Sequence, residues 1–185
     1  MSPILGIYAS QISGHLSTNN FSSIATTTLG STTGSITFSS IPSTYTHLQL
    51  RGISRGAVVE SDDTIYATFN GDTAANYSFH NLLGTGSAAY ANAGTSQSNI
   101  QIARIAEASL TSNDFAAVVI DILDYTNTNK YKTTRSLSGW DGNGSGDIRL
   151  ISGNWRSTSA ITSITLTPGS GSFLQYTQYA LYGVK

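Results

Sequence analysis

Apolar and polar residues alternate with a period of two along much of the chain, and no useful length shows the 3.6-residue period of a helix. Within Thr64–Asn70, the apolar residues Ile65, Ala67 and Phe69 alternate with Thr and Tyr. Within Phe115–Leu123, both alternating sets are largely apolar, which is typical of a strand in the middle of a sheet with both faces covered. The pattern therefore predicts a chain built from short strands.

Turn signals rich in Gly, Asn, Asp and Pro separate these runs. We expect one helical turn within Glu107–Asn113 and a bulge at Gly52. About ten short strands without crossover helices predict an all-β fold, an antiparallel β-sandwich of jelly-roll-like form. The predicted strands are Ile24–Leu29, Ser35–Ser39, His47–Ser54, Thr64–Asn70, Tyr77–Leu83, Asn99–Ile105, Phe115–Leu123, Tyr131–Leu137, Ile148–Ser152, Ile161–Leu166 and Phe173–Val184.

The length of 185 residues fits one domain with an arm. We expect residues 1–20 to form an N-terminal arm or first strand, and residues 21–185 to form a single β-sandwich domain. Two alternatives are open for the arm: it is the first strand of the core, or it docks on another protein by strand addition. The apolar residues expected to dock are Ile4, Leu5, Ile7, Tyr8 and Ile12.

Charged residues are few and lie in the middle of the chain. They make up 10% of the residues, against roughly 25% in ordinary soluble domains. Met1–Leu50 contains none, and Lys185 is the only one after Arg156. Because surface charge keeps free proteins apart, neutral ends predict a protein that works inside an assembly. We expect a homo-oligomer, with a trimer favoured, whose charge-bearing middle from Arg51 to Arg156 faces solvent.

Several classes of function are disfavoured by composition and motifs. A net charge of -1 without a basic stripe argues against nucleic-acid binding. The absence of cysteine excludes disulfides and thiolate metal sites. No apolar run is long enough to insert in a membrane, and Met1–Gly6 does not resemble a signal peptide. No G-x-S-x-G elbow, no His pair at metal-ligand spacing and no phosphate-binding glycine motif occurs. We therefore expect a protein that is not an enzyme and needs no cofactor.

One loop has the composition of a cation site. Asp141, Asn143, Ser145 and Asp147 place oxygen side chains at alternate positions with glycines between them. Such spacing can wrap calcium, as in the first half of an EF-type loop. The alternative is a plain glycine-rich hairpin turn, which the lack of a bidentate Glu at the twelfth position favours.

Four aromatic residues fall around the same loop: Trp140, Trp155, Tyr125 and Tyr131. Exposed aromatic rings beside Asn and Asp suit sugar binding, because the rings stack on the C–H faces of sugars while polar groups bind hydroxyls. The alternative is that the tryptophans pack in the core of the sandwich. A glycan site at these four residues is therefore a hypothesis beside core packing.

Several runs resemble small virion proteins of tailed bacteriophages, particularly phages of aquatic bacteria, and the likeness spans nearly the whole chain. The runs are Pro3–Gly14, Phe38–Pro42, Tyr45–Leu48, Phe69–Asp72 with Asn76–Ser78, and Tyr179–Lys185. The resemblance implies a structural protein on the exterior of the virion, made in the host cytoplasm. Capsid decoration, or an accessory protein docked on capsid or tail through apolar termini, is the leading expectation. The chain has no heptads or fibrous repeat for a stalk, so a tail-fibre or receptor-binding protein comes second. A carbohydrate-binding module for host surface glycans is the alternative of a different class.

Overall fold

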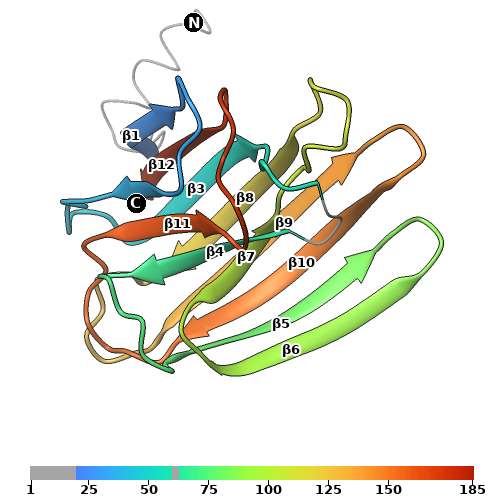
Figure 1. The fold of residues 1–185 in the computed structure, drawn as a ribbon. Helices are drawn as coiled ribbons and strands as arrows, with labels where there is room; N and C mark the ends of the chain where they lie inside the picture. Colours follow the sequence, from blue (N-terminus) through green and yellow to red (C-terminus); the bar gives the residue numbers. More distant parts are fainter. Residues whose placement is uncertain (1–19, 60–62) are drawn as a thin grey trace, which may run out of the picture.

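The structure is a computed structural model that describes residues 20–59 and 63–185, in which all regular elements are β-strands (Figure 1). The strands form two antiparallel sheets, an eight-stranded one in the order β1-β12-β3-β8-β9-β10-β5-β6 and a four-stranded one in the order β2-β11-β4-β7. The strands are β1 Phe21–Thr28, β2 Ile36–Phe38, β3 His47–Ser54, β4 Thr64–Phe69, β5 Tyr77–Gly84, β6 Ala89–Gln97, β7 Ile100–Arg104, β8 Ala116–Leu123, β9 Lys132–Asp141, β10 Gly146–Trp155, β11 Ile164–Pro168 and β12 Gln178–Val184.

The chain passes back and forth between the two sheets. The small sheet β2-β11-β4-β7 and the strands β3, β10, β5 and β6 of the large sheet have the interleaved order of an eight-stranded jelly roll. The hairpin β8–β9 is inserted between β3 and β10, and β12 and β1 extend the large sheet beyond β3. The predicted fold, an antiparallel β-sandwich of jelly-roll-like form, is confirmed.

The core lies between the two sheets and explains the alternation seen in the sequence. Leu50 of β3 and Ile120 of β8 point inward from the large sheet, and Ile102 of β7 and Leu166 of β11 belong to the same buried cluster. Each is at most 2% exposed. In a sandwich of this kind, the inward residues of both sheets interdigitate in one apolar layer, so the residues between them along each strand face outward.

Four local predictions differ from the structure. β6 is missing from the predicted strands, because its sequence AYANAGTSQ contains no large aliphatic residue at alternate positions. The long strand expected at Phe173–Val184 is broken: Phe173 makes only isolated bridges, Tyr176 has a φ of 70°, and β12 begins at Gln178. Glu107–Asn113 holds hydrogen-bonded turns and no helix. Gly52 pairs in continuous register with β8, so it marks no bulge.

β1 begins at Phe21, and the division of the chain into residues 1–20 and 21–185 stays a prediction. The expected docking residues Ile4, Leu5, Ile7, Tyr8 and Ile12 lie outside the described residues, so the arm stays a prediction. Within the described residues, no helix has the length and apolar character needed to cross a membrane.

Candidate functional site

The face of the large sheet that points away from the small sheet carries a row of exposed aliphatic side chains. Val119 of β8, Leu137 of β9, Leu150 of β10 and Leu82 of β5 lie directly opposite one another. Their exposed fractions lie between 42% and 55%. Ala91 of β6 continues the row by its pairing with Leu82. We call these five residues the outer aliphatic row; strand register alone brings them together from distant parts of the sequence.

Beside the outer aliphatic row, the next positions of β8 and β9 carry small side chains. Ala117 of β8 pairs with Gly139 of β9, and Gly139 in turn pairs with Ile148 of β10. A Cβ on Gly139 would lie 2.8 Å from the carbonyl oxygen of Asp147, so the backbone itself requires glycine here. These small residues lie in an open hollow of about 930 Å³.

Apolar side chains line most of the hollow, and residues of two turns complete its lining. The apolar side chains include Phe115, Val119, Leu137 and Ile148, and the turn residues are 84–86, 141 and 144–147. Trp140 also lines the hollow, and its buried indole Nε1 has no hydrogen-bond partner among the described residues. Ligand sites commonly have this volume and a mostly apolar lining with a few polar groups. This hollow is therefore the candidate site.

The loop expected to wrap calcium is a hairpin turn between β9 and β10. The amide of Gly142 donates to the carbonyl oxygen of Ser145 at 2.7 Å, and the amide of Asn143 donates to Asp141 Oδ1 at 2.9 Å. Asn143 has a φ of 57° and Gly144 a φ of 116°, which is the left-handed backbone that such turns need.

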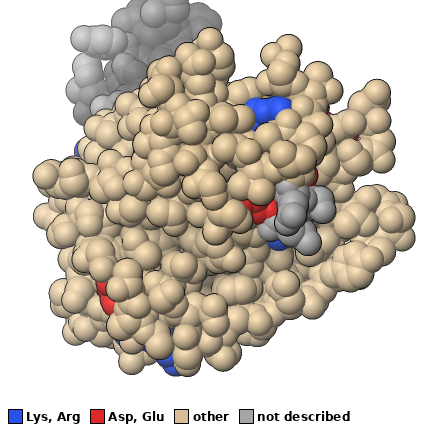
Figure 2. Space-filling model, viewed as in Figure 1, with Lys and Arg blue, Asp and Glu red and all other residues tan. Residues whose placement is uncertain are grey.

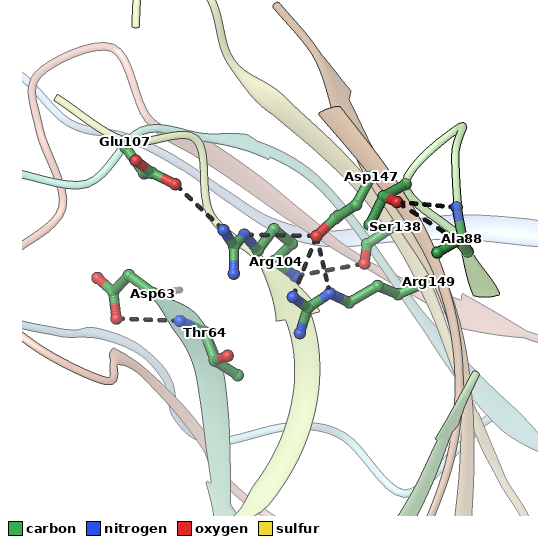
Figure 3. Close-up of polar contacts among 9 residues, drawn as sticks. Asp63, Thr64, Ala88, Arg104, Glu107, Ser138, Asp147 and Arg149 are labelled. Atoms are coloured by element: carbon green, nitrogen blue, oxygen red, sulfur yellow. Dashed lines mark hydrogen bonds and ion pairs between the residues drawn. The ribbon is translucent and has the colours of Figure 1, made fainter. Parts of the chain in front are cut away.

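The four predicted calcium ligands do not converge. Trp140 and Asp147 are paired across β9 and β10 and share the inner face, so Asp141 lies on the opposite face from Asp147. Asp147 Oδ2 is 3.0 Å from the Arg149 guanidinium and 3.6 Å from that of Arg104 (Figure 3). The described residues contain no group of three or more His, Asp or Glu side chains that could hold a metal ion. The geometry therefore corrects the calcium hypothesis in favour of the hairpin turn.

The four aromatic residues of the glycan hypothesis do not share a surface. Trp155 is 2% exposed and Tyr125 is fully buried, where its hydroxyl donates to the carbonyl oxygen of Pro42. Tyr131 is 55% exposed. Trp140 pairs with Asp147 at one end of β10 and Trp155 lies at the other end, which separates them by roughly 27 Å at 3.3–3.4 Å per residue. Trp140 is the one of the four that lines the hollow.

Trp155 belongs to an aromatic cluster with Phe69 and Tyr77, with ring centroids 5.6 to 6.2 Å apart. Its indole Nε1 donates to Asp72 Oδ2 at 2.7 Å, and the Tyr77 hydroxyl donates to the carbonyl oxygen of Asp72 at 2.9 Å. Hydrogen bonds from the Asn76 side chain and from Trp155 lower the pKa of Asp72. Burial raises the pKa of Tyr77 to about 12. Trp155 therefore packs in the core, which is the alternative to a glycan site at this residue.

A cluster of buried charges lies on the inner side of β10 (Figure 3). Arg104 is 3.1 Å from Glu107, and both Arg104 and Arg149 contact Asp147. All four side chains are at most 8% exposed. Burial raises the pKa of the neighbouring Asp63. Such a cluster contributes little net stability compared with apolar packing, but each member depends on its partners. It therefore ties β7 to β10 and to the loop that follows β7.

The charge-bearing middle of the chain does not simply face solvent, which corrects a further expectation. Besides the cluster, Arg55 and Lys132 are buried. Arg55 donates to the backbone carbonyls of Ala108, Leu110, Thr111 and Asp114 at 2.5–3.1 Å. Figure 2 shows few charged side chains on the face that it presents. The sequence pattern does not predict that these residues are buried. A charged residue in an alternating strand fits the same pattern whether its side chain points to solvent or to the interior.

Comparison with known proteins adds little to this geometry. No protein-family model matches the chain, and no curated protein matches it in sequence. Among solved structures, the galectin LEC-6 of Caenorhabditis elegans aligns over 92% of this chain and 99% of its own, with 11% sequence identity and a TM-score of 0.28. A TM-score of this size carries no argument about ligand or function.

Proposed function

We propose that the chain is a non-enzymatic structural protein on the exterior of a tailed-phage virion, docked on capsid or tail proteins as a decoration or accessory protein. The observation that carries the proposal is the outer aliphatic row. Soluble monomers rarely expose contiguous apolar patches larger than a few hundred Å², and larger ones mark interaction sites. A sheet face of this kind fits a partner protein.

The distribution of charge supports the same proposal. Arg55, Arg104, Glu107, Lys132 and Arg149 are buried, so the surface is more neutral than the 10% of charged residues suggests. A neutral surface makes protein contacts without the desolvation of ions. The likeness of several sequence runs to phage virion proteins supplies the location.

The location is tested by immunogold electron microscopy. An antibody raised against the recombinant protein is applied to gradient-purified particles of the phage that encodes the chain. Regular labelling of capsid or tail is the expected result. Particles that carry no label, with the protein found only in the soluble lysate, would overturn the proposal.

The docking face is tested by charge substitution in the outer aliphatic row. Leu137→Glu with Leu150→Glu places carboxylates where a partner would bury apolar groups, so occupancy on particles that lack the native protein should fall at least tenfold. Thr133→Glu is the matched control, since Thr133 is exposed on the same face of β9 and outside the row. Bound copies are counted by quantitative mass spectrometry. Equal occupancy of both variants would exclude this face.

Binding of a host surface glycan is the second candidate, favoured by the hollow. Trp140 and Phe115 are among the residues that line it, together with Asp141, Thr85 and Ser145. Rings beside oxygen groups suit sugars. Trp140→Ala should abolish signals on a glycan array, whereas Tyr131→Ala, which removes an exposed ring away from the hollow, should keep them. An array without any hit for the native protein would count against this candidate.

A further inference from the structure

β6 is a strand that buries almost nothing. Eight of its nine residues are exposed, including Tyr90 at 57%, and only Gly94 is partly buried. Among the described residues, β6 is also the last strand of the large sheet, and β5 is the one strand to which it is hydrogen-bonded. At the other end of the same sheet, β1 has several partly buried residues. Both faces and one edge of β6 are therefore open to solvent.

An open strand of this length is unusual in a folded protein. Natural sheets protect their edges with short strands, charged side chains, proline or bulges. β6 contains no charged residue and no proline. Its irregularity lies at one end, where the register with β5 shifts between Tyr77 and Phe79 and Ser96 has a φ of 54°. The stretch from Ala89 to Gly94 therefore offers a regular, uncharged edge.

We propose that this edge pairs with the same edge of a second copy of the chain, antiparallel and about a twofold axis, to give a dimer with one continuous sheet in place of the trimer expected from the sequence. A strand that pairs with itself must not place like charges opposite each other, and β6 has none. The net charge of -1 means that two whole copies repel each other little. The inference rests on the edge of β6 and does not depend on the proposed function, which uses the outer face.

The side chains of β6 suit such a pair. Ala89, Ala91 and Ala93 alternate on the outer face, so two strands can approach without steric conflict. The outer aliphatic row ends at Ala91 and would run on into the row of the second copy. In an antiparallel pair, residues directly opposite each other lie on the same face of the sheet. The twofold axis therefore places one residue of β6 opposite the same residue of the second copy, and it cannot lie midway between two neighbouring residues. Within Ala89–Gly94, Ala91 or Asn92 takes that position.

The proposed dimer is tested first by measuring the molar mass of the protein in solution. Light scattering on a sizing column should give a dimer of twice 19.5 kDa for the native protein. Ala91→Lys with Ala93→Lys sets ammonium groups opposite each other for either axis, so this variant should elute as a monomer. Thr133→Lys, an exposed change on the same face of β9, should remain a dimer. Circular dichroism checks that all three are folded.

The position of the axis is tested by cross-linking, because the chain has no cysteine of its own. Directly opposite residues in a sheet have Cβ atoms about 4.5–5.5 Å apart, near enough for a disulfide. Either Ala91→Cys or Asn92→Cys should form a covalent dimer under mild oxidation, and Thr133→Cys should not. A native monomer or trimer, a lysine variant that remains dimeric, or the failure of both cysteine variants to cross-link would each overturn the proposal.

Discussion

Lys132 is fully buried at the start of β9, and backbone carbonyl groups surround its ammonium. It donates to the carbonyl oxygens of Lys130 at 3.0 Å, Thr158 at 3.1 Å and Asn127. Burial lowers its pKa, because the charged form is the one that loses hydration. A single side chain therefore holds the turn before β9 against the loop after β10.

Lys132→Met should lower the free energy of unfolding by roughly 2–4 kcal/mol, because the methyl end leaves these buried carbonyls without a donor. Lys130→Met is the control: its side chain is 61% exposed and pairs with Asp124 at 2.7 Å, so roughly 0–1 kcal/mol is expected. Urea unfolding monitored by circular dichroism measures both. Losses of equal size would show that the buried ammonium has no special role.

Asp72 predicts a dependence of stability on pH. Its pKa in the folded protein lies below the ordinary 3.8, because the Asn76 side chain and then Trp155 donate hydrogen bonds to the carboxylate. The stabilisation is therefore fully present above the unfolded pKa and is lost as pH falls through the lower, folded pKa. Asp72→Ala should cost about 1–3 kcal/mol at pH 7, because the Trp155 indole N–H loses its acceptor. The gap between native and variant should narrow at pH 3; a gap independent of pH would contradict the assignment.

At the scale of elements, long-range contacts explain what local patterns could not. Gly52 looked like a bulge because glycine interrupts a strand, yet its true partner is the ring of Tyr179 on β12, far later in the chain. β6 escaped prediction because a strand with neither face buried has no apolar alternation. Trp140 and Trp155 are close in sequence, but the hairpin register places Trp140 of β9 beside one end of β10 and Trp155 at the other end. The strands that bury one face were predicted well, because a buried face requires an apolar residue at every second position.

Gly52→Ala should lower the free energy of unfolding by roughly 2–3 kcal/mol through overpacking. A Cβ at this position would lie 2.3 Å from Tyr179 Cδ1 and 2.8 Å from the carbonyl oxygen of Gln178. The Tyr179 ring is fully buried and has no room to move aside. Gly34→Ala serves as the matched control, since no atom lies within 4 Å of its added Cβ, and its effect should stay within about 0.5 kcal/mol. Thermal unfolding of the two variants separates crowding from a general effect of alanine.

For the whole molecule, the interleaving of the two sheets predicts one cooperative unit. Every strand of the small sheet is separated in sequence from the others of that sheet by strands of the large sheet, so neither sheet can form alone from a continuous segment. The buried ion pair between Arg104 and Asp147 joins β7 to β10 across the layers. The interior therefore carries several charged side chains, which ordinary soluble domains keep on their surface.

Unfolding in urea should accordingly show a single transition. Fluorescence of Trp155 in a Trp140→Phe variant reports one end of β10, and far-UV circular dichroism reports all strands, so their midpoints should coincide. Fluorescence of the native protein adds Trp140 at the other end. Separate midpoints would mean that the hairpin β5–β6 or the end of the sandwich near the hollow unfolds independently.

The pairing of β1 with β12 sets Phe21 opposite Val184, and the amide of Lys185 donates to the carbonyl oxygen of Asn20 at 3.2 Å. The described domain is thus nearly a closed ring of chain, and a linker of a few residues would join Lys185 to Asn20 in a circular permutant. Opening that ring at Gly144 would create new ends beside the hollow. A dye or affinity tag attached at Lys185 would instead sit near β12, about six strand spacings or roughly 29 Å from β6. A label at the new ends would then report on the hollow, whereas a label at Lys185 would leave β6 uncovered.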